Sequence, residues 1–132
     1  MNFLVCEDDE TSLDLVCELI SLTWPKSAVF AARDGGTGLA LFREHLPEVV
    51  ITDVQMPVLD GVKMCREIET IKPDVKTILM SAYRKQTMED LTVKLTSIRF
   101  YFFKPLVYQE LVGAISHCLV NEPEGPVAMP AP

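Results

Sequence analysis

The chain has 132 residues, of which 48% are hydrophobic and 23% charged, and its formal net charge is −7. This length suits one domain, and the composition excludes a disordered polar tail. The acidic balance argues against a nucleic-acid-binding surface, which needs clustered cations to neutralise phosphates. No segment is long and apolar enough to cross a bilayer, and the start, MNFLVCEDDE, does not resemble a signal peptide.

The four cysteines are scattered, with no CxxC pair and no histidine cluster beside them. Zinc and redox motifs are therefore not expected. Each cysteine falls on an apolar face of a predicted element, where a free thiol behaves as a small hydrophobic group. This usage indicates a reducing, cytoplasmic setting.

Short apolar runs alternate along the chain with segments whose apolar residues recur at helical spacing. Thr11 or Ser12 is expected to cap the first helix. In chain order the pattern predicts the strand Phe3–Cys6, a helix around Leu13–Ile20, the strand Ala28–Ala32, a helix around Leu39–Leu46, the strand Val49–Thr52, a helix around Met64–Ile71, the strand Thr77–Met80, a helix around Met88–Ile98, the strand Tyr101–Phe103 and a helix around Leu111–Leu119.

The predicted strands lack the alternation of a half-exposed sheet, which indicates strands covered on both faces, as in a parallel sheet. Right-handed crossovers place helices on both sides of such a sheet. We therefore predict one doubly wound α/β domain of (βα)5 type over residues 1–120. The proline-rich residues 121–132 cannot continue a helix and are expected to form a tail or the start of a linker.

Polar residues follow the predicted strands, and in an open parallel sheet ligands bind beyond these carboxyl ends. Arg33 and Asp34 follow the second strand, which can lie to one side. The other strands are followed by Glu7, Asp8 and Asp9, then by Asp53, then by Ser81 and Ala82, and finally by Lys104.

Carboxylates crowded at one edge repel each other unless a cation joins them. Oxygen ligands without histidine or cysteine suit Mg²⁺, or Mn²⁺ as an alternative. An aspartate in such a site can act as the nucleophile in phosphoryl transfer, with a lysine and a hydroxyl contacting the phosphoryl oxygens. Taken singly, each residue has a simpler explanation: Asp8 or Asp9 as a helix N-cap, and Lys104 as part of a turn.

The motifs FLVCEDDE, VVITDVQMPVLDG, TILMSA and YFFKP resemble, in order and spacing, the receiver domain of two-component response regulators. The resemblance extends from Met1 to about Leu119. It implies a flavodoxin-like sandwich with a five-stranded parallel sheet of order 2-1-3-4-5. It also implies a phosphoacceptor that assists its own phosphorylation and dephosphorylation, and not an enzyme that turns over a separate substrate.

By this resemblance, Asp53 accepts a phosphoryl group from a phosphohistidine on a sensor histidine kinase or phosphotransfer protein. The resemblance makes Asp8 and Asp53 direct Mg²⁺ ligands and Glu7 a ligand through water. The backbone carbonyl of Gln55 would complete the protein's share of the metal shell.

The resemblance places Lys104, Ser81 and Ala82 against the phosphoryl group, and makes Ser81 and Tyr101 the switch pair. Their rearrangement would reshape the face formed by the fourth helix, fifth strand and fifth helix, for an output domain, a partner protein or a homodimer. Without the resemblance, Tyr101 would be read as ordinary core packing.

Two other functions agree with part of this pattern. A phosphatase or phosphotransferase acting on small substrates would use Asp53 as nucleophile, but it commonly needs an acid two residues later, where this chain has Gln55. A flavodoxin-like binding module needs a phosphate loop after the first strand, where EDDET would repel phosphate. The chain departs from the family pattern at Ser97–Phe100, SIRF, which makes the exit of the fourth helix less regular. Gln55 and Tyr83 flank the site at positions that affect water access in the family.

Overall fold

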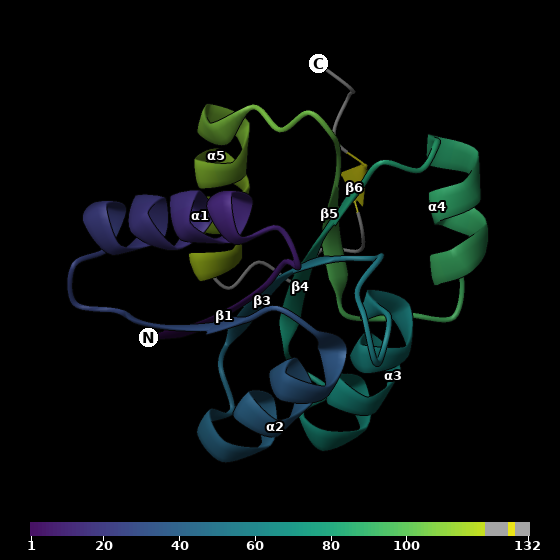
Figure 1. The fold of residues 1–132 in the computed structure, drawn as a ribbon, viewed down its shortest axis with the longest axis horizontal. Helices are drawn as coiled ribbons and strands as arrows, with labels where there is room; N and C mark the ends of the chain where they lie inside the picture. Colours follow the sequence, from purple (N-terminus) through teal and green to yellow (C-terminus); the bar gives the residue numbers. More distant parts are fainter. Residues whose placement is uncertain (121–126, 129–132) are drawn as a thin grey trace.

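A computed structural model describes residues 1–120 and 127–128 (Figure 1). Among these residues, six parallel strands form one sheet in the order β2-β1-β3-β4-β5-β6, which confirms the predicted order of the first five. Of the tail predicted over 121–132, only the two residues of β6 are described, and the prediction did not include this strand. The strands are β1 (Asn2–Cys6), β2 (Ala28–Ala32), β3 (Val49–Asp53), β4 (Lys76–Ser81), β5 (Ile98–Phe103) and β6 (Val127–Ala128).

Five helices cover the two faces of the sheet. Helices α1 and α5 pack on one face, and α2, α3 and α4 pack on the other (Figure 1). Each helix connects two parallel strands, as the alternating sequence pattern predicts. The helices are α1 (Glu10–Thr23), α2 (Gly35–His45), α3 (Gly61–Ile71), α4 (Lys85–Thr92) and α5 (Tyr108–Leu119).

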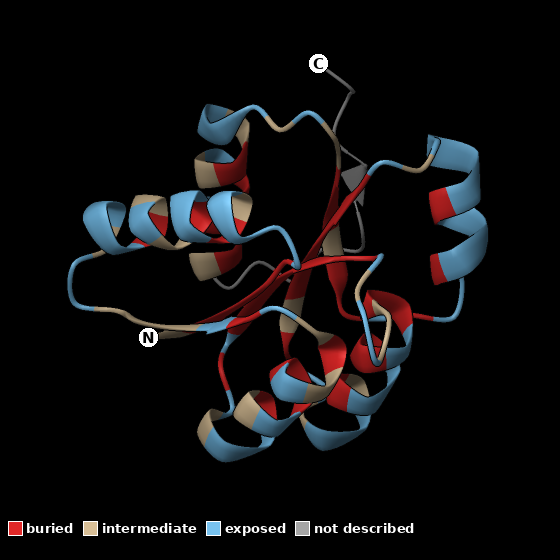
Figure 2. Cartoon of the chain, in the orientation of Figure 1, coloured by how far each residue is buried: buried red, intermediate tan, exposed pale blue. Residues whose placement is uncertain are grey.

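The central strands are buried on both faces, which explains their continuous apolar sequences (Figure 2). In β1, Phe3 and Val5 join the cluster under α1 and α5, whereas Leu4 and Cys6 join the cluster under α2 and α3. Burial raises the pKa of all four cysteine thiols. The thiols therefore stay protonated and pack as small apolar groups, as the sequence predicted.

Aspartate side chains cap the first three helices. Asp9, Asp34 and Asp60 each accept a hydrogen bond from the backbone N–H three residues further on, at 2.7–2.9 Å. The prediction of Thr11 or Ser12 as the first cap is therefore wrong, since Ser12 is the donor to Asp9. Such a cap satisfies a backbone N–H that the first helical turn leaves without a partner.

The fourth helix is shorter than its sequence pattern predicted. It ends at Thr92, Leu95 lies in the following loop, and Ile98 already belongs to β5. The carboxylate of Glu69 on α3 explains this early end, because it accepts a hydrogen bond from the backbone N–H of Ser97 at 2.8 Å and so fixes the entry into β5. Leu95 and Ile98 continue the apolar spacing of α4 although they lie outside the helix, and for this reason the sequence predicted a longer helix.

The sheet-to-helix connection after β3 depends on a glycine. A Cβ atom at Gly61 would lie 2.1 Å from the backbone oxygen of Asp53. Gly113, on the exposed side of α5, has no such neighbour within 4 Å.

We expect Gly61→Ala to lower the free energy of unfolding by about 1–3 kcal/mol, because the added methyl group must push the Asp53 backbone aside. The matched variant Gly113→Ala should raise it by about 0.5–1 kcal/mol through helix propensity. Urea denaturation of both variants measures the difference. A Gly61→Ala protein as stable as the wild type would contradict the close approach.

Candidate functional site

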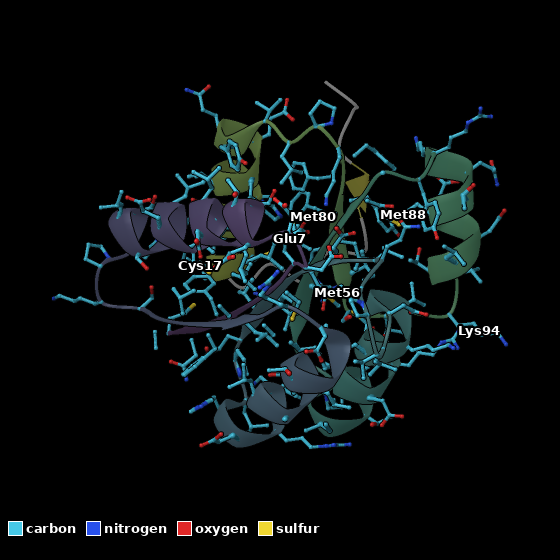
Figure 3. The ribbon with its side chains drawn as sticks, in the orientation of Figure 1. Glu7, Cys17, Met56, Met80, Met88 and Lys94 are labelled. Carbon is cyan, nitrogen blue, oxygen red and sulfur yellow. The ribbon has the colours of Figure 1, made fainter. Side chains whose placement is uncertain are left out.

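The candidate site lies at the carboxyl ends of the three central strands and β5. Glu7 follows β1, Asp53 and Ser81 are the last residues of β3 and β4, and Lys104 follows β5. Figure 3 shows Glu7 near the middle of the molecule, where these strand ends meet. Glu7 is 2% exposed and Asp53 5% exposed, so both carboxyl groups are largely withdrawn from water.

The ammonium group of Lys104 connects the two buried acids. Its Nζ donates to Asp53 Oδ2 at 2.5 Å and to the two carboxylate oxygens of Glu7 at 3.1 and 3.2 Å. The Lys104 backbone N–H also donates to the Ser81 carbonyl at 2.8 Å, which fixes the start of the lysine segment against β4. The structure thus places Glu7, Asp53 and Lys104 in contact at the end of the sheet, and the roles expected of them stay predictions.

Asp8 completes a cluster of three carboxyl groups with Glu7 and Asp53. One oxygen from each lies within 4.8 Å of the others. Asp8 is exposed, so the cluster faces water on one side. The donor set contains carboxylate oxygens only and leaves one side open for water or phosphate, which fits Mg²⁺.

The surroundings of Glu7 and Lys104 change the pKa of both groups. Burial and, after it, the neighbouring Asp53 carboxyl raise the pKa of Glu7 to about 7, although Lys104 opposes the rise. Burial alone would lower the pKa of Lys104, but its hydrogen bonds and charge interactions with Asp53 and Glu7 outweigh burial and raise it. The lysine thus remains a cation and donates hydrogen bonds to the carboxyl groups of both Glu7 and Asp53.

The loop after β3 folds back over the phosphoacceptor candidate. The backbone N–H of Gln55 donates to Asp53 Oδ1 at 3.2 Å. The Gln55 side-chain amide donates to the Tyr83 hydroxyl at 3.0 Å, and the Tyr83 backbone N–H donates to Ser81 Oγ at 2.8 Å. Ala82, which lies between Ser81 and Tyr83 in the sequence, is exposed. Two loops from neighbouring strands are thus joined beside the acidic cluster.

Tyr101 lies inside the molecule, on the side of β5 that faces α4. It is 8% exposed and packs with Leu79, Met88 and Leu95. Its hydroxyl lies 3.0 Å from Thr92 Oγ1, and Thr92 Oγ1 also donates to the Met88 carbonyl at 2.8 Å. Sequence reasoning did not select Thr92, since a threonine at the end of a helix gives no signal that it will meet a tyrosine nine residues away.

The residues after β2 contribute little to the cluster. The Asp34 side chain caps α2. Arg33 donates through Nη2 to the backbone carbonyl of Asp8 at 3.2 Å and so supports the loop after β1. This agrees with the expectation that the second strand lies to one side of the site.

The sequence matches the response regulator receiver domain family over residues 3–116. The chain belongs to this family. A probable transcriptional regulator, ycf27, of Guillardia theta is 34% identical over 112 residues, which are 82% of this chain and 41% of that protein. A receiver domain from Clostridium thermocellum has a TM-score of 0.79 at 30% identity, covering 90% of this chain and 94% of that one. CheY in a CheX–CheY–BeF3–Mg structure from Borrelia burgdorferi shares the fold, with a TM-score of 0.80 at 19% identity over 92% of this chain and 90% of that one.

As a receiver domain of two-component response regulators, this chain carries an acidic pocket of the type that holds Mg²⁺ in the family. Receiver domains are typically phosphoacceptors and not enzymes in the usual sense. The chain spans about half the length, or less, of the curated relatives that it matches. None of the helices in the described residues has the length and apolar character needed to cross a membrane.

The raised pKa of Glu7 predicts a pH-dependent stability in metal-free buffer. A carboxyl whose folded pKa is about 7, against an ordinary value of 4.5, stabilises the fold fully below pH 4.5, and this contribution is lost as the pH rises through 7. We therefore expect Glu7→Gln, which stays neutral, to gain thermal stability relative to the wild type between pH 5 and pH 8. Melting curves in chelator test this, and parallel pH profiles of the two proteins would contradict it.

The Thr92–Tyr101 contact predicts an energetic coupling between α4 and β5. Thr92→Val leaves the buried Tyr101 hydroxyl without this partner and should cost about 1–3 kcal/mol of unfolding free energy. Tyr101→Phe should cost less, because Thr92 keeps its bond to the Met88 carbonyl. A double-mutant cycle by urea denaturation should give a coupling of at least about 0.5 kcal/mol. Additive effects would show that the two hydroxyl groups do not interact.

Proposed function

We propose that this receiver domain is a Mg²⁺-dependent phosphoacceptor whose Asp53 takes a phosphoryl group from a phosphohistidine on a sensor histidine kinase or phosphotransfer protein. The observation that carries the proposal is the pairing of Asp53, the buried last residue of β3, with Lys104 Nζ at 2.5 Å, inside a cluster of further acids. Family membership supports the same assignment.

The acidic cluster supports the metal part of the proposal. Asp8 and Asp53 are proposed as direct ligands, Glu7 as a ligand through water, and the Gln55 backbone carbonyl as the remaining protein ligand. When bound, Mg²⁺ offsets the carboxylate charge and attracts phosphoryl oxygens. Burial first, and the neighbouring Asp53 carboxyl second, raise the pKa of Glu7, so this acid loses its proton less readily in the folded cluster than in water, and a bound cation would favour its ionised form.

The transfer step uses the groups around Asp53. One carboxylate oxygen of Asp53 forms the new bond to phosphorus as the bond from phosphorus to the imidazole nitrogen breaks, and that nitrogen leaves with its electron pair. Lys104 gives up its hydrogen bond to Asp53 and donates to a phosphoryl oxygen instead. Its positive charge then offsets the negative charge that develops on that oxygen during transfer. Ser81 and the exposed Ala82 segment provide further hydrogen-bonding groups at the end of β4. Gln55 stands two residues after Asp53 and carries an amide, so no side-chain acid is available there for a small-substrate phosphatase.

The switch part of the proposal concerns Ser81 and Tyr101. Ser81 Oγ now accepts from the Tyr83 backbone N–H, and a phosphoryl group on Asp53 offers this hydroxyl a strong acceptor. Tyr101 is held through Thr92, so a shift of the β4–α4 loop acts on the same short helix. The face of α4, β5 and α5 is proposed to change shape for an output domain, a partner protein or a second copy of the chain.

Incubation with acetyl phosphate and Mg²⁺ tests the phosphoacceptor directly. We expect one added phosphoryl group, seen as a mass increase of about 80 Da, and no increase in chelator. Asp53→Asn should abolish the increase because an amide is not a nucleophile of this type.

Asp60→Asn is the matched control, since this aspartate caps α3, is not one of the clustered acids and should leave the modification unchanged. An unmodified wild-type protein, or an Asp53→Asn protein modified as fully as the wild type, would overturn the assignment.

A further inference from the structure

The turn between β2 and α2 contacts both loops that carry the proposed metal ligands. It consists of Arg33, Asp34 and Gly35, which connect the end of β2 to the first turn of α2. Neither Arg33 nor Asp34 belongs to the cluster of three acids, and β2 stands at one end of the strand order. Any contribution of this β2–α2 turn to the site therefore comes through the two loops that it contacts.

Arg33 attaches the loop after β1 to the turn. Its Nη2 and Nε donate to the backbone carbonyl of Asp8 at 3.2 and 3.4 Å. The backbone N–H of Glu7 donates to the carbonyl of Ala32, the last residue of β2, at 3.0 Å. Two successive residues of the acidic loop are thus held from the end of β2, one through the backbone and the other by a planar guanidinium group. These bonds restrict the backbone from which the exposed Asp8 carboxylate projects.

The loop after β3 contacts the same turn. The backbone N–H of Gly35 donates to the carbonyl of Pro57 at 3.3 Å, and a Cβ atom at Gly35 would lie 1.8 Å from the backbone oxygen of Leu59. Glycine allows two backbones to approach this closely because it has no Cβ. The start of α2 thus packs directly against the loop that contains Gln55, whose backbone carbonyl is the proposed metal ligand.

The turn is itself held in place by the cap of α2. Asp34 Oδ1 accepts from the backbone N–H of Thr37 at 2.7 Å, and Asp34 Oδ2 accepts from the Thr37 hydroxyl at 2.9 Å. Such a cap fixes the first turn of a helix. Because α2 packs through Phe42 into the same buried cluster as β1 and α3, the turn is part of a well-supported element.

Arg33 has two opposite effects on a bound Mg²⁺. Its positive charge repels the metal, whereas its hydrogen bonds reduce the loop conformations that are lost when Asp8 ligates the metal. The Arg33 side chain is 60% exposed, and its Nη1 lies 3.9 Å from a carboxylate oxygen of Glu10, so water, salt and this acid weaken the repulsion. We therefore expect the hydrogen bonds to matter more than the charge.

We propose that the β2–α2 turn positions two metal-binding loops for Mg²⁺. Arg33 positions the loop after β1, and Gly35 positions the loop after β3. Both act as positioning residues, since neither supplies a ligand. Mg²⁺ demands near-ideal octahedral geometry, and loops that are held in advance meet this demand with less loss of conformational freedom. The inference rests on the proposed function, because it concerns the same metal site.

Calorimetric titration of the metal-free chain with MgCl2 tests the role of Arg33. We expect Arg33→Ala to raise the Kd for Mg²⁺ by about tenfold, as losses of groups that support metal ligands commonly do. Hydrogen exchange of residues 7–10 in chelator should also become faster. An effect of charge alone has the opposite sign, a lower Kd, because the variant removes a cation.

Arg43→Ala is the matched control for this variant. The Arg43 side chain is 58% exposed, also pairs with an acid at 3.9 Å and lies in the last turn of α2. Its removal takes away the same charge without touching the β2–α2 turn, and should leave the Kd within about twofold of the wild type.

Gly35→Ala tests the contact with the second loop. The added methyl group must displace the Leu59 backbone, so we expect the Kd to rise about fivefold or more. Exchange at residues 54–60 should become faster while exchange at 49–53 in β3 is unchanged. Gly36→Ala is the control, because a Cβ atom there would meet side-chain atoms of Val58 and Asp34, at 3.1 and 3.2 Å, which can shift.

The outcomes separate this inference from the proposed function. An unchanged or lower Kd in Arg33→Ala or in Gly35→Ala would overturn the role assigned to that residue, and an equal rise in Arg43→Ala would overturn the role of Arg33. A wild type that binds no Mg²⁺ at millimolar concentration would overturn the proposed metal site as well. If Asp8→Ala abolishes binding and neither turn variant weakens it, only the positioning role fails.

Discussion

The site depends on one lysine placed between two buried carboxyl groups. Glu7 and Asp53 would repel each other in a largely dry pocket, and Lys104 Nζ holds both through hydrogen bonds of 2.5–3.2 Å. Burial and, after it, the neighbouring Asp53 carboxyl keep the pKa of Glu7 raised although Lys104 lowers it, so one cation offsets only part of the cost of ionising Glu7. The pocket therefore favours further positive charge, and any anion that arrives there must be accompanied by it. A metal ion would supply this positive charge, and it would offset the negative charge of a phosphoryl group that enters beside it.

This arrangement requires the register of the central sheet. Glu7, Asp53 and Lys104 come from strand ends that are far apart in sequence, and β1 and β5 are separated by β3 and β4. A slip of one residue in a strand would move every side chain to the opposite face of the sheet. It would also place a different residue at the carboxyl end of the strand, where the site lies. The cores on both sides fix the register, because alternate residues of β1 enter different clusters. Packing and site geometry are therefore specified by the same side chains.

The sequence was sufficient where one physical signal dominated. Strands buried on both faces appear as apolar runs, and polar residues directly after them locate the site edge, so Asp53, Ser81 and Lys104 could be placed together. The end of α4 could not be predicted, because Leu95 and Ile98 keep the helical spacing, whereas the Glu69 carboxylate on α3 fixes the loop between them. Thr92 could not be selected from the sequence either, because its contact with Tyr101 exists only in the folded chain.

Helix α4 buries fewer residues than the other helices in the described part of the chain, so it has the smallest apolar attachment to the sheet. It has eight residues, no side-chain N-cap, and only Met88 and Thr92 buried. Its polar connections lie at its two ends: the Gln55–Tyr83–Ser81 bonds precede it, and the Thr92–Tyr101 contact ends it. A helix held by a long apolar face would resist a change at one hydroxyl group. A short helix held at its ends has few contacts to exchange, which is why the proposed switch at Ser81 would act on the position of α4 relative to β5.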